Sequence, residues 1–382
     1  MQLSVIILNY NVRYFLELCI ISVQKAIENL DAEIIVVDNN STDDSCAMLQ
    51  SCFPDIRLIQ NKQNFGFPKG NNIGVEVAQG KYICILNPDT VVAQDTFEKI
   101  LGFANLQTNL GIIGCKLIDG KGFFLPESKR GIPSPWVAFT KIFGWYKIFP
   151  NSEYFNQYYA QHLSETKTGK VAILVGAFMV MKRDLYLQVG GFDENCFMYS
   201  DDIDLSYMVL QKGKSNYYFH ETTVIHYKGE STVKDGTYMK RFQEAMNFFY
   251  KKHFQVSVFF SLFMKMGIFL FSLSKKLQGK PIAKSEIESY ILFSDDEILR
   301  NKLQIQFGKQ VHFYDKFSKL PNNKFIEIIF DNNQLDFYSI INKMEILKQS
   351  NVSFKILPKS CQFLIGSNSS LDRGEIIQLT DF

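Results

Sequence analysis

Carboxylates gather at two places in this sequence of 382 residues. Asp89 ends the run Asn87-Pro88-Asp89, directly after the apolar segment 82–86, and three more lie within Asp201-Asp202-Ile203-Asp204. A carboxylate at a strand end can bind Mg²⁺ or Mn²⁺, hard cations that commonly bridge a diphosphate. Adjacent carboxylates repel one another, so the second group predicts a proton-transfer site or a compensating cation. The structural alternatives are a simple turn at Asn87-Pro88-Asp89 and a helix N-terminus at Asp201.

The elements that must position these groups have the pattern of a parallel α/β sheet. Up to residue 90, short β-branched runs alternate with segments of helical periodicity, which is typical of βαβ units. Ligands bind at the carboxyl ends of such strands, where Asn9, Asp38 and Asp89 all lie. We expect strands at 4–8, 34–37, 56–60 and 82–86 and helices at 12–27 and 71–78.

Seven short motifs occur in the order found in one enzyme family. The motifs are Val5–Asn11, Val36–Asp43, Asn64–Phe67, Gly70–Asn72, Leu86–Asp89, Gly190–Asp193 and Asp201–Leu205. Together they resemble family 2 glycosyltransferases of the GT-A fold, in particular the rhamnosyltransferase-like branch that works on bacterial surface polysaccharides. The resemblance covers residues 3 to 232 and implies a GT-A domain with a mixed, mainly parallel sheet.

The resemblance implies a nucleotide-sugar site beside a metal. Asp38 matches the family's base-binding carboxylate, and Asn87-Pro88-Asp89 matches its D-x-D metal motif with Asn in the first place. His226 matches the metal-ligand histidine, although a lone histidine is more often structural. Asp89 and His226 are thus the expected ligands of Mg²⁺ or Mn²⁺. The implied nucleotide-sugar-binding residues are Asn9, Tyr10, Asp38, Asn40, Asn64, Gly66, Lys69, Asn71, Asn72 and Asn87.

The family mechanism is transfer with inversion at the anomeric carbon. A carboxylate of the acidic motif deprotonates the acceptor hydroxyl while the metal stabilises the departing nucleoside diphosphate. Because a neighbouring carboxylate raises the pKa of a base, we expect Asp202 to be the catalytic base, with Asp201 as the second candidate. Many relatives carry Arg where this chain has Met208, and we expect Lys228 or Lys69 to supply that cation.

Two further features refine this expectation. Gly66 and Gly70 lack a Cβ atom, which would let the backbone approach a phosphate closely. Both tryptophans, Trp136 and Trp145, precede the acidic motif, so the Q-x-x-R-W motif of processive synthases is missing. We therefore expect the addition of one sugar, rhamnose or another hexose, per acceptor.

Charge and cysteine usage exclude other classes of protein. The 41 Lys and Arg nearly balance 39 Asp and Glu, which excludes electrostatically driven binding of nucleic acid. Seven scattered cysteines without a C-x-x-C pair are expected to be reduced core residues. The N-terminal residues lack the basic flank and cleavage site of a signal peptide, so we expect a cytoplasmic protein.

The 35 Phe and 18 Tyr exceed the needs of a core and indicate a surface that meets lipid. Phe254–Leu273 is mainly apolar with flanking lysines, and we expect it to lie on the inner leaflet of the cell membrane. A membrane span or an interdomain helix is the alternative. The aromatic loop Trp136–Tyr159, with Lys129 and Arg130 nearby, is expected either to contact lipid and a polyprenyl-diphosphate-linked acceptor or to form a hydrophobic lid.

The chain thus divides into three expected segments: a GT-A catalytic domain at 1–235, a helical, membrane-interfacial segment at 236–280, and a small α/β domain of unknown role at 281–382. Two other functions remain open. One is a non-catalytic nucleotide-sugar or glycan-binding protein that retains the fold, which Asn87 and Met208 favour. The other is a membrane scaffold built on the C-terminal domain. In that domain we expect strands near 290–293, 310–314, 325–330 and 352–357 and helices near 297–307 and 336–349.

Overall fold

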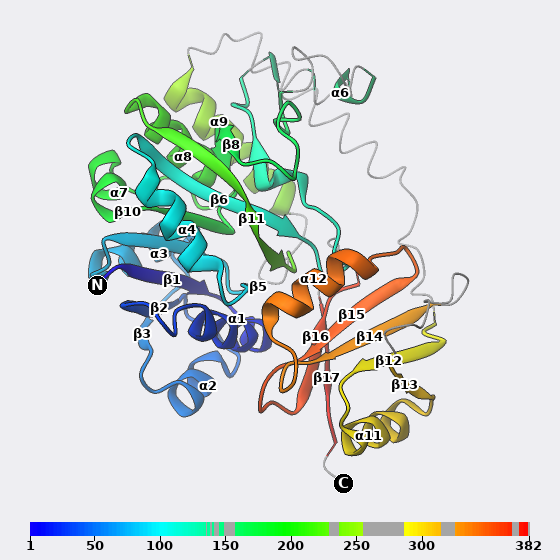
Figure 1. Ribbon diagram of the computed structural model, residues 1–382. Coiled ribbons are helices and arrows are strands. Elements are labelled where there is room, and N and C mark those ends of the chain that lie inside the picture. The colour runs from blue at the N-terminus through cyan, green and yellow to red at the C-terminus, as the bar shows by residue number, and fades with distance from the viewer. Residues whose placement is uncertain are drawn as a thin grey trace.

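The computed structural model describes two α/β sheets that are joined by a shared hydrophobic cluster (Figure 1). The described residues are 1–134, 136–137, 140, 145–148, 157–228, 237–254, 286–314, 325–368 and 374–380.

The N-terminal sheet has the strand order β3-β2-β1-β4-β10-β6-β11-β5, with β8 beside β11. Its pairs are parallel except those made by β10, β5 and β8. The predicted mixed, mainly parallel sheet is therefore confirmed. The strands are β1 (Leu3–Asn9), β2 (Ala32–Asp38), β3 (Arg57–Gln60), β4 (Tyr82–Leu86), β5 (Thr90–Val91), β6 (Leu110–Ile118), β8 (Gly169–Val171), β10 (Phe178–Lys182) and β11 (Ser215–His226). A separate pair joins β7 (Lys129–Arg130) to β9 (Ile173–Leu174).

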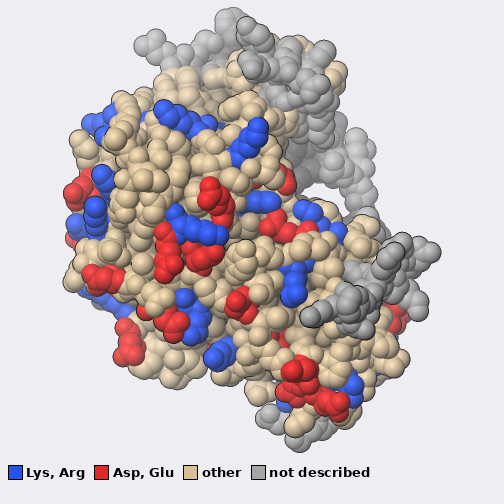
Figure 2. Space-filling model, in the orientation of Figure 1, with Lys and Arg blue, Asp and Glu red and all other residues tan. Residues whose placement is uncertain are grey.

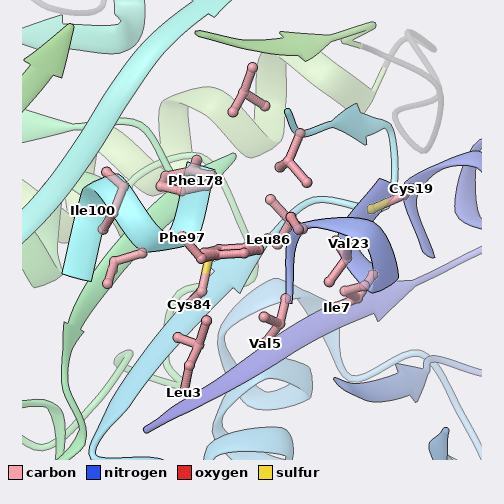
Figure 3. Packing of buried hydrophobic residues seen from close by; sticks show 14 of the residues in the cluster. Leu3, Val5, Ile7, Cys19, Val23, Cys84, Leu86, Phe97, Ile100 and Phe178 are labelled. Carbon is pink, nitrogen blue, oxygen red and sulfur yellow. The ribbon is translucent and has the colours of Figure 1, made fainter. Parts of the chain in front are cut away.

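Helices cover both faces of this sheet, which explains why β1 and β4 are apolar without alternation. One face packs on α1 (Arg13–Ala26), α2 (Ser45–Cys52) and α4 (Thr96–Leu106), in a core where Phe97, Phe178 and Leu86 meet (Figure 3). The other face packs on α3 (Gly66–Val77), α7 (Arg183–Val189) and α8 (Asp201–Gln211). All seven cysteines are free thiols; Cys19, Cys84, Cys115 and Cys196 are buried as expected, whereas Cys52 is exposed.

The C-terminal domain is a second α/β sheet in the order β13-β12-β14-β15-β16-β17. The first four strands are parallel and the last two antiparallel, so the predicted small α/β domain is present. Its elements are β12 (Ser289–Phe293), α11 (Glu297–Phe307), β13 (Val311–Phe313), β14 (Ile326–Asp331), α12 (Phe337–Leu347), β15 (Val352–Leu357), β16 (Phe363–Gly366) and β17 (Glu375–Gln378).

Two short elements, η1 (Pro126–Ser128) and α6 (Trp145–Ile148), lie between β6 and β8 in sequence, and α9 (Thr237–His253) lies between the two sheets. Most of the aromatic loop and nearly all of the expected membrane segment, from residue 255 onward, lie outside the described residues. Among the residues described, no helix is long and apolar enough to cross a bilayer. On the face shown in Figure 2, Lys and Arg alternate with Asp and Glu, in line with the near-zero net charge.

One buried amide fastens the acidic helix to the sheet. Asn216 on β11 is fully buried. Its Oδ1 accepts the backbone N–H of Ile112 at 3.0 Å, and its Nδ2 donates to the carbonyls of Ala172 at 2.8 Å and Ser206 at 3.0 Å. Ser206 belongs to α8 and Ile112 belongs to β6. The Asn216 side chain therefore joins α8 to both β6 and β11.

We expect Asn216→Ala to lower the free energy of unfolding by about 3 kcal/mol or more, because each buried polar group left unpaired costs about 1–3 kcal/mol. Chemical denaturation measures the change. The matched control is Asn109→Ala, an exposed asparagine that donates to the Gly213 carbonyl at 2.6 Å, for which we expect a change within about 0.5 kcal/mol. Equal losses in the two variants would contradict the assigned role.

Candidate active site

The two residues predicted to hold a metal meet where β4 and β11 end. The short strand β5 pairs antiparallel with the end of β11, with Thr90 opposite His226, and the Tyr227 N–H donates to the Asp89 carbonyl at 3.0 Å. The His226 Nε2 atom lies 3.4 Å from Asp89 Oδ1 and 3.3 Å from Asn87 Nδ2. Both Asp89 and His226 are buried. The structure thus brings together residues that the sequence alone does not connect.

This group has the chemistry of an incomplete metal site. The Oδ1 atoms of Asp89 and Asn87 are buried without a hydrogen-bond partner among the described residues, and unpaired buried oxygens are costly unless something binds them. Two oxygens and an imidazole nitrogen suit a divalent cation. Within the described part of the chain, no three His, Cys, Asp or Glu side chains form a metal site. A bound cation would therefore need further oxygen ligands, such as those of a diphosphate.

A second polar cluster lies where β1 and β2 end, at the predicted base-binding residues. Asn9 Nδ2 donates to Asp38 Oδ1 at 2.7 Å, and the other carboxylate oxygen accepts the Ser41 N–H at 2.9 Å. Asn40 is exposed beside it with a positive φ of 64°, and Tyr10 is half-buried. Asn9 and Asp38 are therefore held rigidly in position, while Asn40 and Tyr10 remain accessible.

Two glycines of α3 contact protein atoms rather than an open site. The φ of Gly66 is +82°, and a Cβ there would lie 2.8 Å from the Phe197 carbonyl oxygen. A Cβ on Gly70 would lie 2.4 Å from Leu8. The missing Cβ atoms thus make room for Phe197 and Leu8, and a phosphate beside these glycines stays a prediction. The Gly66 N–H instead donates to the Asn64 side chain at 2.9 Å.

The other predicted residues of α3 differ in how they are engaged. Asn72 Oδ1 accepts the Tyr186 hydroxyl at 2.6 Å, and Asn72 Nδ2 donates to the Phe192 carbonyl at 2.9 Å. Asn72 therefore ties α3 to the loop before the acidic helix. Asn71 keeps a buried Oδ1 atom without a partner, and the partly exposed Lys69 lies 3.5 Å from Glu194.

The three carboxylates of the acidic motif lie in the first turn of α8, where the helix dipole favours negative charge. Asp204 is fully buried, and two residues of α9 contact it: Lys252 Nζ forms an ion pair with it at 2.8 Å, and His253 Nε2 lies 2.5 Å from it. The predicted compensating cation is thus present for Asp204. This arrangement also fastens α9 to α8.

Asp202 has a different partner, Arg130 of β7. The buried guanidinium forms an ion pair with Asp202 Oδ2, which also accepts the Gly176 N–H at 3.1 Å. Although burial acts against it, the Asp202 carboxylate raises the pKa of Arg130 above its ordinary value. Asp202 Oδ1 remains buried without a partner among the described residues. Asp202 therefore has one oxygen fixed by two donors and one buried oxygen for which the described residues supply no donor.

Burial and the neighbouring Asp202 charge raise the pKa of Asp201 to about 7. Sequence reasoning expected a raised pKa in the Asp201–Asp202 pair, and Asp201 is raised.

Sequence reasoning missed Arg130 as a site residue. Arg130 and Lys129 were expected to meet lipid or a lipid-linked diphosphate acceptor. Both are buried, and Lys129 Nζ donates to the Tyr159 and Ala160 carbonyls, so neither side chain is exposed to a lipid surface. Lys228, a proposed substitute for the missing arginine, forms an ion pair with Glu127. One signal in the sequence could have pointed to such a residue: three carboxylates so close together need cations near them, so a buried basic residue was to be expected beside the acidic motif.

Fold and site define a parallel α/β protein with buried carboxylates, amides and an imidazole at the carboxyl ends of its strands, where such folds bind nucleotides. Residues 4–190 match the model of the family described as Glycosyl transferase family 2. The N-terminal domain of this chain belongs to that family, as predicted, and is a glycosyltransferase domain.

Two relatives resemble the chain over most of their own length. The N-acetylglucosaminyl-diphospho-decaprenol L-rhamnosyltransferase of Mycobacterium tuberculosis is 25% identical over 246 residues, which cover 61% of this chain and 78% of that protein. The rhamnosyltransferase WbbL of Escherichia coli K12 is 28% identical over 232 residues, covering 54% and 78%. Among solved structures, a mannosyltransferase of Pyrobaculum calidifontis in complex with GDP-Man and Mn²⁺ has a TM-score of 0.49 at 16% identity, covering 73% of this chain and 76% of its own.

The two adjacent carboxylates should affect stability in opposite directions at pH 8. Because the folded protein raises the pKa of Asp201, wild type loses stability as the pH rises from about 4 to 7. Asp201→Asn avoids this loss, so we expect a higher unfolding temperature than wild type at pH 8 and a smaller difference at pH 5.

Asp202→Asn is the matched comparison, because it leaves the buried Arg130 guanidinium without its ion-pair partner. We expect a loss of about 3 kcal/mol or more. Thermal unfolding of both variants between pH 5 and pH 8 measures the effects, and destabilisation of Asp201→Asn at pH 8 would contradict this interpretation.

Proposed function

We propose that this chain is an inverting, divalent-metal-dependent glycosyltransferase that moves one sugar from a nucleoside diphosphate sugar to a saccharide acceptor. One pair of neighbouring contacts carries the proposal. The Asn87 N–H donates to the Ala177 carbonyl at 3.0 Å, and the adjacent Gly176 N–H donates to Asp202 at 3.1 Å. The candidate metal residues and the candidate base therefore converge on the same two backbone residues.

The donor would lie along the carboxyl ends of β1, β2 and β4. Asp38, held by Asn9, would accept a hydrogen bond from the base, with Tyr10 and Asn40 at the accessible side. Asn64, Lys69, Asn71 and Asn87 would line the path to the diphosphate, and Asn72 and Gly66 would keep that segment in place. The buried free oxygens of Asn9, Asn71 and Asn87 support this assignment.

Asp89 and His226 would hold Mg²⁺ or Mn²⁺, with Asn87 beside them. When bound, such a cation neutralises the charge that develops on the leaving diphosphate. The chain's own contribution is to fix the two ligands at the sheet edge through the Tyr227 N–H and the β5–β11 pairing.

Asp202 would act as the general base. Arg130 and the Gly176 N–H fix one carboxylate oxygen, and the other takes the proton of the acceptor hydroxyl. The hydroxyl oxygen then forms a bond to the anomeric carbon as the bond from that carbon to the diphosphate oxygen breaks. Asp201 is the second candidate, and burial and the Asp202 charge raise its pKa, which is the direction expected when two carboxylates lie side by side.

The acceptor is proposed from the relative. The mycobacterial protein is named for an acceptor on diphospho-decaprenol and for the transfer of L-rhamnose. We propose a polyprenyl-diphosphate-linked saccharide acceptor here, rhamnose or another hexose as the sugar, and peripheral attachment to the inner leaflet of the cell membrane through 254–273. Such an acceptor would require the active site to work at a membrane surface.

Removing either the candidate base or the candidate metal ligand should abolish sugar transfer without unfolding the protein. We expect Asp202→Asn and Asp89→Ala each to lower the transfer rate by at least about 100-fold, measured as release of nucleoside diphosphate in the presence of acceptor. The control is Asp31→Asn, which removes a carboxylate that pairs with the N-terminus and should retain the wild-type rate. Full activity of Asp202→Asn or Asp89→Ala would overturn the site assignment.

Metal dependence has its own test. With Mn²⁺ and a panel of nucleotide sugars, we expect one donor class to raise the unfolding temperature by mass action. With acceptor added, that donor should release nucleoside diphosphate, and EDTA should stop the release until Mn²⁺ is restored. Donor binding without release under any condition would favour the non-catalytic alternative.

A further inference from the structure

The C-terminal domain packs directly behind the candidate metal residues. One buried cluster contains Val91, Ile225 and Tyr227 of the catalytic domain together with Phe330 and Met344 of the C-terminal domain. Val91 and Ile225 form one of the two residue pairs between β5 and β11, and the other pair places Thr90 opposite His226. The apolar side of this short ladder is therefore covered jointly by α1 and by the second domain, with α12 beside the end of β11 (Figure 1).

Tyr227 is central to this contact. It follows His226 in sequence, is buried, and packs edge-on against Phe15 at 5.0 Å between ring centroids. Its N–H is the group that donates to the Asp89 carbonyl. A Cβ on Gly120 would lie 3.0 Å from the Tyr227 ring and 2.7 Å from the Ser367 carbonyl oxygen. Gly120 thus lets the C-terminal domain approach the tyrosine closely.

Polar contacts fix the orientation of the two domains. Lys116 on β6 forms an ion pair with Glu345 on α12 at 2.7 Å, and Thr223 on β11 donates to the same carboxylate at 3.2 Å. Lys121 Nζ donates to the Ser350 carbonyl at 2.8 Å. These bonds lie beside the apolar cluster. Because hydrogen bonds and ion pairs are directional, they restrict sliding of the C-terminal domain against the catalytic domain.

The physical need for such support is clear from the size of the ladder. β5 contains only two residues, and a two-residue pairing at a sheet edge is a weak structure on its own. A displacement of about 1 Å in a catalytic group can lower a rate by about 100-fold. Phe15 and Leu18 of α1 belong to the same cluster as Val91, Ile225 and Tyr227, so without the second domain only the cover supplied by α1 would remain.

We propose that the C-terminal domain is a positioning domain for the Asp89–His226 pair: by burying the β5–β11 ladder and Tyr227, it holds the two ligands at the separation that a cation requires. This inference rests on the proposed function for its metal, but the positioning of the two residues does not. Met344 and Glu345 are positioning residues, since they act through β11 and Tyr227 rather than on the substrate.

The two helices of the C-terminal domain offer a matched pair of variants. Met344 on α12 and Leu303 on α11 are both fully buried, but Met344 belongs to the cluster shared with the catalytic domain and Leu303 to the cluster on the domain's other face. Met344→Ala and Leu303→Ala each leave a cavity and destabilise the C-terminal domain. Glu345→Gln removes the Lys116 ion pair without a cavity, so it serves if the alanine variants fold poorly.

Two measurements on the full chain test the proposal. Hydrogen exchange reports the Tyr227 amide, which we expect to exchange about 10-fold faster in Met344→Ala and at the wild-type rate in Leu303→Ala. The electron paramagnetic resonance signal of free Mn²⁺, in a mixture of thymidine, uridine and guanosine diphosphates, reports metal affinity. We expect a dissociation constant raised roughly 5-fold in Met344→Ala, a smaller rise in Glu345→Gln and none in Leu303→Ala.

Other results of these two measurements would overturn the positioning role of the C-terminal domain or the metal in the proposed function. Equal effects of Met344→Ala and Leu303→Ala, or an unchanged Tyr227 amide in Met344→Ala and Glu345→Gln, would overturn the positioning role. A faster amide with unchanged Mn²⁺ affinity would also overturn it. If wild type binds no Mn²⁺, the metal in the proposed function fails, while the amide exchange still shows whether the second domain holds the ladder.

Discussion

The pairing of β5 with the end of β11 is the contact on which the candidate site depends. It places Thr90 opposite His226, and the Tyr227 N–H closes the arrangement on the Asp89 carbonyl. Asp89, which follows the central strand β4, thereby lies beside His226, which comes from a distant part of the chain. Both lie at the carboxyl edge of the sheet, where the backbone leaves the strands and side chains can face a ligand. The C-terminal domain contributes apolar side chains to the cluster that covers this short pairing.

Charge compensation is the second constraint. Three carboxylates in one helical turn repel one another, so nearby cations or bound protons must compensate their charge. Lys252 and His253 pair with Asp204, Arg130 pairs with Asp202, and Asp201 responds to burial by a rise in pKa to about 7. The carboxylates of one motif therefore differ in their surroundings: Asp204 fastens α9, and Asp202 keeps one buried oxygen without a hydrogen-bond partner among the described residues.

The fold was largely predictable because its strands are buried on both faces and so appear as continuous apolar runs. β4 and β15 have the predicted bounds, whereas α3 begins at Gly66 instead of residue 71, since glycines and a proline obscure its first turn. Strand β6 and helix α4 were not predicted at all. The pairing of Arg130 with Asp202 spans 72 residues, and no local pattern reveals such a contact. The interface between domains was equally hidden, because a face that covers a neighbour has the same pattern as a face that covers its own core.

The most direct measurement is anomalous diffraction at the manganese edge from crystals of the full chain grown with Mn²⁺ and a nucleoside diphosphate. The account predicts a peak in contact with the Asp89 carboxylate and His226 Nε2, beside the diphosphate and next to Asn87. A peak on the Asp201–Asp202 pair instead, or a bound diphosphate with no peak at Asp89, would contradict it.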